Sequence, residues 1–152
     1  MEELTSVREI LEKTGKYTGL TQGVSMRPMI HQGRDNIIVV KNKERLKKYD
    51  VPVYQLKNGK YVMHRIIEVY DDHYVTMGDN LKVREYVTDD MICGKLVGYF
   101  KKGKRYIDCD KNKFYRLYSK IVVALIPIRP FTIFVNRCFA YIENHFIKRH
   151  KK

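Results

Sequence analysis

A hairpin signal in the middle of the chain constrains the fold most strongly. The segment KKYDVPVYQLKNGKYVMHRIIEVY places two apolar runs on either side of Asn58-Gly59. Asn-Gly is favoured in two-residue hairpin turns because both positions tolerate a positive φ. Pro52 cannot donate a ladder hydrogen bond, so it places the first strand at a sheet edge or beside a bulge. The segment therefore predicts two antiparallel strands.

Further short apolar runs end in turn residues. NIIVVK is a continuous branched run that suits a buried strand, and HYVTMGDN predicts a strand that ends in a Gly-Asp-Asn turn. MICGKLVGYFKKGKRYIDCD predicts a strand pair around Lys102-Gly103. Residues 19–110 are therefore expected to form one mainly β domain, a folded sheet or barrel.

The N-terminal segment, residues 1–18, predicts a short amphipathic helix. Ser6 and Glu9 have the spacing of a capping box, and Gly15 suits the end of the helix. The segment carries acids and has no apolar core, so it does not look like a secretory signal. We expect it to pack on the domain.

The C-terminal tail, residues 111–152, is apolar, aromatic and basic. Two prolines and an arginine interrupt its most apolar stretch, Ile121 to Val135. A free-standing membrane span needs about 20 apolar residues without such breaks. Two interpretations stay open: short interfacial helices anchored by basic residues at a membrane, or a helical cap on the β domain. A true span is the third choice.

Charge and cysteines limit the function classes. The 152 residues carry a formal net charge of +13, which attracts nucleic acid, anionic lipid or acidic peptides without choosing among them. The three cysteines form no CxxC pair. This spacing argues against both a disulfide framework and a zinc site, and we expect no metal.

A serine on a rigid turn is the first candidate for chemistry. GVSMRPMI places Ser25 between Gly23, which allows close backbone approach, and Pro28, which restrains the exit. A serine hydroxyl becomes a nucleophile at neutral pH only with a base beside it. Without such a base, the stretch is typical of an ordinary turn.

His64, in YVMHRII, is the best candidate for that base. On an alternating strand, His64 would share a face with Val62 and Ile66. Asp79, in TMGDN, lies at a strand end, where a carboxylate can hold an imidazole in one tautomer. Each residue alone also has a purely structural interpretation, as a core histidine or as an Asx turn.

Four fragments, in order along the chain, carry a family resemblance. GVSMRPMI, VMHRIIEV, TMGDN and ICGKLVGY together resemble the signal peptidase I superfamily, which includes the LexA-like self-cleaving proteins. The resemblance covers roughly Leu20 to Tyr99 and implies a LexA/signal peptidase-like β fold. His64 stands where the bacterial housekeeping enzymes have a lysine. The His-Arg pair resembles the archaeal and endoplasmic-reticulum branch.

The resemblance implies a serine endopeptidase with Ser25 as nucleophile and His64 as general base. Asp79 matches the motif carboxylate of the family. That branch carries a second aspartate further on, where this chain has Glu85, so whether Asp79 or Glu85 orients His64 stays open. Gly23 replaces a frequent hydroxyl donor, so the oxyanion would rely on backbone N–H groups. No cofactor is implied.

The expected substrate is the leader or signal segment of an exported protein or peptide. It would bind extended, between Thr21 to Val24 and the strand that leads to His64. Shallow apolar pockets would hold small side chains, with contributions from Ile37 to Val40. The expected substrate-binding residues are Gly23, Val24, Met26 and Met63.

Membrane contact is expected through the tail. Typical relatives in the superfamily carry an N-terminal membrane span, and the sequence from Met1 has no such apolar run. The tail would therefore take over the attachment to the membrane. The many basic residues favour a domain on the cytoplasmic face.

Three alternatives stay open. A LexA-like self-cleaving regulator is disfavoured by the short segment ahead of the β domain and by the missing lysine base. A non-enzymatic basic β domain with 12 tyrosines could bind single-stranded nucleic acid. The basic residues also flank the apolar tail, which favours an anionic membrane, so no specific nucleic acid is expected. A decayed peptidase scaffold that only binds peptides is the third.

Overall fold

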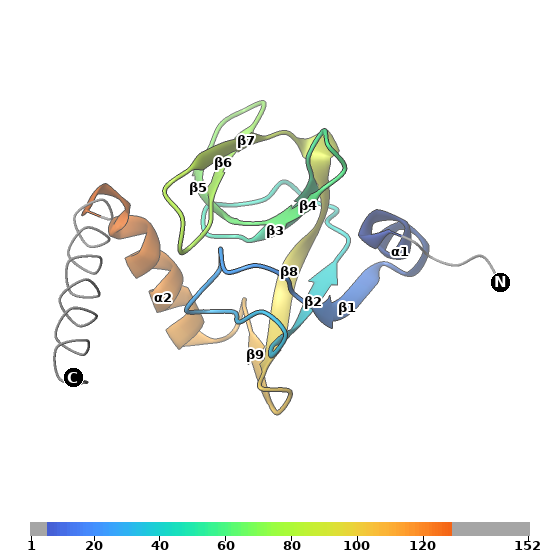
Figure 1. The fold of residues 1–152 in the computed structure, drawn as a ribbon. Helices are drawn as coiled ribbons and strands as arrows, with labels where there is room; N and C mark the ends of the chain where they lie inside the picture. The colour runs from blue at the N-terminus through green and yellow to red at the C-terminus, as the bar shows by residue number, and fades with distance from the viewer. Residues whose placement is uncertain (1–5, 129–152) are drawn as a thin grey trace, which may run out of the picture.

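A computed structural model describes residues 6–128, which form a mainly β fold with a curled sheet and two α-helices (Figure 1). The β-branched and aromatic residues of the middle segment favour extended backbone. The mainly β class predicted from the sequence is confirmed.

The larger sheet has six strands within the described residues, and all of their pairings are antiparallel. The strand order is β1-β2-β8-β3-β4, and β9 pairs with β8. The ten-residue β8 is long enough to pair with three other strands along its length. The strands are β1 (Lys16–Leu20), β2 (Asn36–Val40), β3 (Pro52–Gln55), β4 (Tyr61–Met63), β8 (Ile92–Lys101) and β9 (Arg105–Asp108).

The curl of this sheet brings its two edges to one pocket. Strands β1 and β4 are the two ends of the hydrogen-bonded path, yet side chains from both line one pocket. Register shifts at Ile38/Val39 of β2 and at Val53/Tyr54 of β3 interrupt the pairing with β8. Such bulges bend and twist a strand, which helps the sheet to curl and bring its edges together.

The predicted hairpin around Asn58-Gly59 is confirmed, and it joins β3 to β4. Gly59 has a φ of 81°, which glycine adopts without strain. Pro52 begins β3, which lies between β8 and β4 and next to a register shift. Of the two positions predicted for Pro52, the bulge is therefore the one that the structure supports.

A smaller three-stranded antiparallel sheet follows. The segment YVMHRII, predicted as one strand, is interrupted at His64, where the chain leaves β4 and enters the smaller sheet. His64 therefore lies between the two sheets and not within a regular strand. The strands are β5 (Arg65–Val69), β6 (Tyr74–Met77) and β7 (Arg84–Val87), and a short 3-10 turn, η1 (Asp89–Met91), precedes β8.

The N-terminal helix, α1 (Val7–Thr14), is confirmed. The side chain of Ser6 accepts a backbone N–H of the first turn, and Gly15 ends the helix in the left-handed conformation with a φ of 73°. Strand β1 begins directly afterwards at Lys16, so the segment predicted as 1–18 already contains the start of the sheet.

The first part of the predicted tail contains helix α2 (Lys113–Ala124) and the 3-10 turn η2 (Ile126–Ile128). Asn112 caps α2 by accepting the N–H of Tyr115 at 2.9 Å. Among residues 6–128, no helix has the length and apolar character needed to cross a membrane. The rest of the tail, residues 129–152, lies outside the described residues, as does the part of the predicted membrane contact that falls on it.

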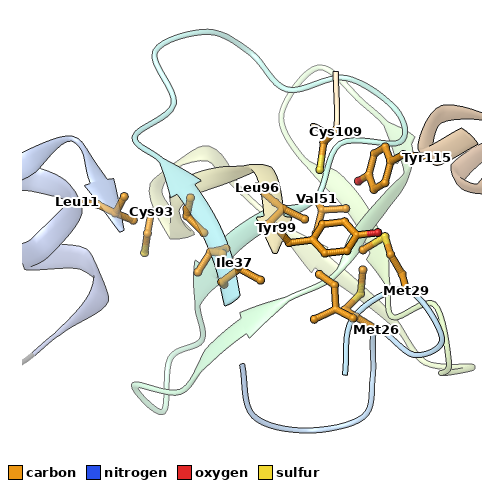
Figure 2. Close-up of a cluster of buried hydrophobic side chains, with 13 residues drawn as sticks. Leu11, Met26, Met29, Ile37, Val51, Cys93, Leu96, Tyr99, Cys109 and Tyr115 are labelled. Carbon is orange, nitrogen blue, oxygen red and sulfur yellow. The ribbon is translucent and has the colours of Figure 1, made fainter. Parts of the chain in front are cut away.

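The main hydrophobic core connects both helices to the curled sheet. Figure 2 shows Leu11 of α1 and Cys93 at one end of this core, Cys109 and Tyr115 at the other, and the ring of Tyr99 between them. The two cysteines are free and buried. Burial raises the pKa of the Cys109 thiol to about 12.

The turn between β1 and β2 is anchored in the same core. Met26, Met29 and Ile30 are all buried there (Figure 2 labels the two methionines). Burying a side chain of this size stabilises a fold by about 1.5–3 kcal/mol. The residues that follow Ser25 therefore fix the position of the turn that carries it.

Candidate active site

Ser25 lies half-buried in the turn between β1 and β2. Asn80, in the turn after β6, holds this segment: its backbone N–H donates to the carbonyl of Ser25 at 2.8 Å, and its side-chain amide donates to the carbonyl of Val24 at 3.3 Å. A Cβ placed on Gly78 would lie 2.9 Å from the carbonyl oxygen of Ser25. Only glycine lets the two turns approach so closely, and the Gly-Asp-Asn sequence thereby fixes the serine's backbone.

His64 is almost completely buried, with 5% of its surface exposed. Its Nδ1 lies 2.9 Å from Oε2 of Glu85, a residue of β7. A carboxylate can only accept, so Nδ1 carries the proton and Nε2 keeps its lone pair. Within residues 6–128, no hydrogen bond engages Nε2. The contact with Glu85 therefore selects the tautomer that a general base needs.

Tyr54, a fully buried residue of β3, completes this cluster. Its hydroxyl donates to Oε2 of Glu85, lies 3.0 Å from Oγ1 of Thr76 and lies 3.2 Å from Nδ1 of His64. Because its single proton goes to Glu85, the Thr76 hydroxyl donates to it. Burial, reinforced by the Glu85 carboxylate, raises the pKa of the Tyr54 phenol, so it stays a donor.

Sequence reasoning did not find Tyr54 or Thr76. Tyr54 lies in an apolar strand outside the four fragments, and Thr76 begins the fragment TMGDN, in which only Asp79 was given a role. The one signal was that buried tyrosine and threonine hydroxyls need hydrogen-bond partners. That rule does not say which partner, and the Tyr54 and Glu85 side chains come from positions 31 residues apart.

Asp79 does not contact the imidazole. Its two carboxylate oxygens accept from Nε and Nη2 of Arg65, each at 2.8 Å. Both side chains are fully buried, at 0% exposure for Arg65 and 1% for Asp79. Of the two candidate carboxylates, Glu85 is therefore the one beside His64. Asp79 was predicted as a carboxylate that could hold the imidazole; in the structure, its charge is paired with the guanidinium of Arg65 instead.

The buried Arg65 connects the site to helix α2. Its Nη1 donates to Oγ of Ser119 at 2.7 Å and to the carbonyl of Tyr49 at 3.1 Å. The hydroxyl of Tyr118 donates to Asp79 at 3.1 Å. Burial alone would lower the pKa of Arg65, but the ion pair with Asp79 outweighs it and raises this pKa, so the guanidinium is always charged.

Ser25, His64 and Glu85 line one pocket of about 790 Å³. Within the described residues, no hydrogen bond joins the Ser25 hydroxyl to the His64 ring. The structure thus brings the predicted nucleophile and base to the same pocket without bonding them to each other. Of the predicted substrate-binding residues, the exposed Val24 does not line the pocket; those that do are Gly23, Met26, Met63 and Ile37.

Burial lowers the pKa of His64 below its usual value of 6.5, and the charge of Glu85 opposes this effect. The net direction is downward, so the imidazole is neutral at neutral pH. A neutral imidazole with a free Nε2 can accept a proton from a hydroxyl group in the pocket.

Comparisons with protein-family models, with curated proteins and with solved structures give no match to this chain. Within residues 6–128, no group of histidine, cysteine, aspartate and glutamate side chains is arranged to hold a metal ion.

Proposed function

We propose that this chain is a serine endopeptidase with a LexA/signal peptidase-like fold, which cleaves leader or signal segments of exported proteins or peptides. One observation carries the proposal. Ser25, His64 and Glu85, far apart in the sequence, line one pocket, and Glu85 occupies Nδ1 of the imidazole. A serine-histidine-carboxylate triad uses the same three groups: the carboxylate orients the imidazole, and the imidazole takes the proton of the serine hydroxyl.

In the proposed mechanism, the hydroxyl of Ser25 attacks the scissile carbonyl carbon while Nε2 of His64 takes its proton. Glu85 stabilises the imidazolium that forms, and the imidazolium then donates the proton to the leaving amine. Water, activated by the same imidazole, hydrolyses the acyl-enzyme and regenerates Ser25. The attack by Ser25 requires its hydroxyl to point toward Nε2 of His64 when the substrate is bound.

The curled sheet supports the binding of an extended substrate. Strands β1 and β4 are edges of the larger sheet, and edge strands carry unpaired N–H and C=O groups. Side chains from both edges line the pocket that contains Ser25. A peptide strand that enters this space would pair with one or both edges and place its carbonyl groups along the pocket.

The pocket walls favour apolar substrate side chains. Near the nucleophile, the buried Met26 and Ile37 form an apolar surface. Leu20 and Tyr17 of β1 line the same pocket and add to its apolar surface. Side chains that flank the cleaved bond would rest on this surface, and we expect a preference for small apolar residues there.

Cleavage assays with candidate leader peptides, followed by mass spectrometry, test the proposal. The wild type is compared with Ser25→Ala and His64→Ala, and we expect both variants to lose cleavage. Ser6→Ala and His73→Ala are matched controls, because both residues lie outside the pocket lining. Equal cleavage by the wild type and all four variants would eliminate the proposal.

A further inference from the structure

Helix α2 exposes a stripe of apolar side chains that do not pack against the β domain. The spacing of three and four residues places the members of this stripe on one side of a helix. The opposite side of α2 carries the buried Tyr115 and Ser119 and packs on the β domain. The stripe consists of Phe114, Leu117, Ile121 and Leu125, with 82%, 55%, 47% and 44% of their surfaces exposed.

A row of cations runs beside the apolar stripe. Lys113, Arg116 and Lys120 each precede a stripe residue by one position, so the row is rotated by about 100° from the stripe. All three are exposed, and none has an ion-pair partner among residues 6–128. The helix therefore presents apolar and positive faces side by side.

Arg116 and Lys120 also line a pocket of about 290 Å³ between α2 and the segment before β3. Lys47 and Lys48 line the same pocket. The four cations of its lining outnumber its two carboxylates, which also share one ammonium: Nζ of Lys95 lies 3.0 Å from one carboxylate and 3.3 Å from the other. The pocket therefore has an excess of positive charge that suits a phosphate group. The paired carboxylates are Asp50 and Asp110.

We propose that this face of α2 docks on an anionic membrane surface. The apolar stripe enters the boundary between headgroups and acyl chains, and the cations contact lipid phosphates. Interfacial helices combine an apolar face with flanking lysine and arginine in this way. The net charge of +13 adds attraction to an anionic leaflet. The proposal does not depend on the peptidase activity.

The pattern of charged and apolar residues favours an anionic membrane over two other partners, a second copy of the chain and a nucleic acid. A second copy docked through the same face would bring two rows of cations together, which is unfavourable. A nucleic acid would pair with the cations but would leave the apolar stripe in water. An anionic bilayer can bury the apolar stripe and pair with the row of cations at the same time.

The absence of tryptophan from the chain allows a sharp test. Phe114→Trp introduces a single reporter within the stripe, at a site so exposed that folding does not depend on it. With vesicles of phosphatidylcholine mixed with phosphatidylglycerol, we expect its emission to shift to the blue and to be quenched by brominated lipid. Tyr86→Trp, on β7 and also largely exposed, is the matched control and should stay unchanged.

The contribution of the cations is tested in the same background. Arg116→Glu combined with Lys120→Glu should weaken vesicle binding by about tenfold or more, because basic residues near an anionic surface each contribute to attachment. Lys102→Glu with Lys104→Glu, in the turn between β8 and β9, is the control for net charge. Far-UV circular dichroism checks that each variant is folded.

Three results would overturn the proposal. The first is an emission at position 114 that anionic vesicles leave unchanged. The second is an equal shift with phosphatidylcholine alone, because the cations would then add nothing. The third is an emission already shifted to the blue without vesicles, because the chain itself or a second copy would then cover the stripe.

Discussion

Nδ1 of His64 lies 2.9 Å from Oε2 of Glu85, and the same oxygen accepts the hydroxyl of Tyr54. One carboxylate oxygen thus accepts hydrogen bonds from two side chains, His64 and Tyr54, that are both buried. Charge-assisted hydrogen bonds of this kind are stronger than neutral ones and restrict the ring geometrically. In the proposed mechanism, this arrangement keeps Nε2 unprotonated and ready to act as a base.

Replacing Glu85 tests that arrangement. In Glu85→Gln, the carboxylate no longer fixes the tautomer or stabilises the imidazolium, so we expect kcat to fall by about 10²–10⁴-fold. The Glu85 charge also raises the pKa of His64 against the effect of burial. Its removal should therefore move the acidic limb of the rate profile to lower pH.

Measurement of kcat/KM across the pH range distinguishes this outcome from a general loss of structure. Glu68→Gln is the matched control, because Glu68 pairs with Arg84 outside the pocket. An acidic limb that moves to higher pH, or a full rate in Glu85→Gln, would contradict the assigned contact.

Stability should respond to pH through the same histidine. Burial lowers the pKa of His64 in the folded chain. As the pH falls below about 6.5, the unfolded chain takes up the proton first, so the free energy of unfolding decreases until the folded chain is protonated as well. Above that pH the imidazole is neutral in both states, and its contribution is constant.

Urea unfolding of the wild type and His64→Gln at about pH 7.5 and about pH 5 measures this effect. We expect the wild type to lose more stability on acidification than His64→Gln does. The comparison with His73→Gln, which changes a histidine outside the pocket, shows whether the effect is specific. An identical pH response of wild type and His64→Gln would contradict the burial argument.

The local part of the fold was predictable because its causes are local. Asn58-Gly59 and Lys102-Gly103 specify hairpins by their own backbone preferences, and Ser6 and Gly15 specify the ends of α1. The interruption at His64 was not predictable. It depends on how the curled sheet meets the smaller sheet, and alternation of residue types along one segment does not contain that information.

The candidate site was predicted only in part. Motifs indicated Ser25 and His64, but the choice between Asp79 and Glu85 required three-dimensional contacts. One signal was present and unused: Arg65 is a charged residue that enters a run of apolar residues, Ile66 and Ile67, in a predicted strand. A buried guanidinium needs a carboxylate partner, and Asp79 is that partner. That pairing would have left Glu85 for the imidazole.

Breaking the buried ion pair should destabilise the protein strongly. Asp79→Asn leaves the guanidinium of Arg65 buried without its counter-charge, which typically costs about 3–5 kcal/mol. Only uncharged partners of Arg65 would then remain among its hydrogen bonds within residues 6–128, including Ser119 at 2.7 Å and the carbonyl of Tyr49 at 3.1 Å. Denaturant unfolding measures the loss.

A double-mutant cycle separates the pair from the individual residues. Arg65→Met combined with Asp79→Leu removes both charges, so we expect it to be less destabilised than the sum of the single variants. Additive losses would show that the two side chains do not act as a pair.

Gly78 offers a test of how the turn after β6 positions the nucleophile. A Cβ at this buried position would lie 2.9 Å from the carbonyl oxygen of Ser25 and 3.0 Å from Cδ1 of Leu81. The oxygen belongs to the backbone, so it can move away only if the turn that carries Ser25 moves too. A misplacement of about 1 Å at a reacting group can cost about 10²-fold in rate. Gly78→Ala should therefore reduce kcat/KM by about that factor.

Gly103→Ala is the matched control for this change. Gly103 has a φ of 67° in the β8–β9 turn, and a Cβ there would meet no atom within 4 Å. Its replacement should lower stability slightly through backbone strain and leave the rate unchanged. Measuring kcat/KM and urea unfolding for both variants separates positioning from stability. If Gly78→Ala keeps the full rate, the close approach of the two turns does not position Ser25, because a shift of its backbone would then have no consequence for the chemistry.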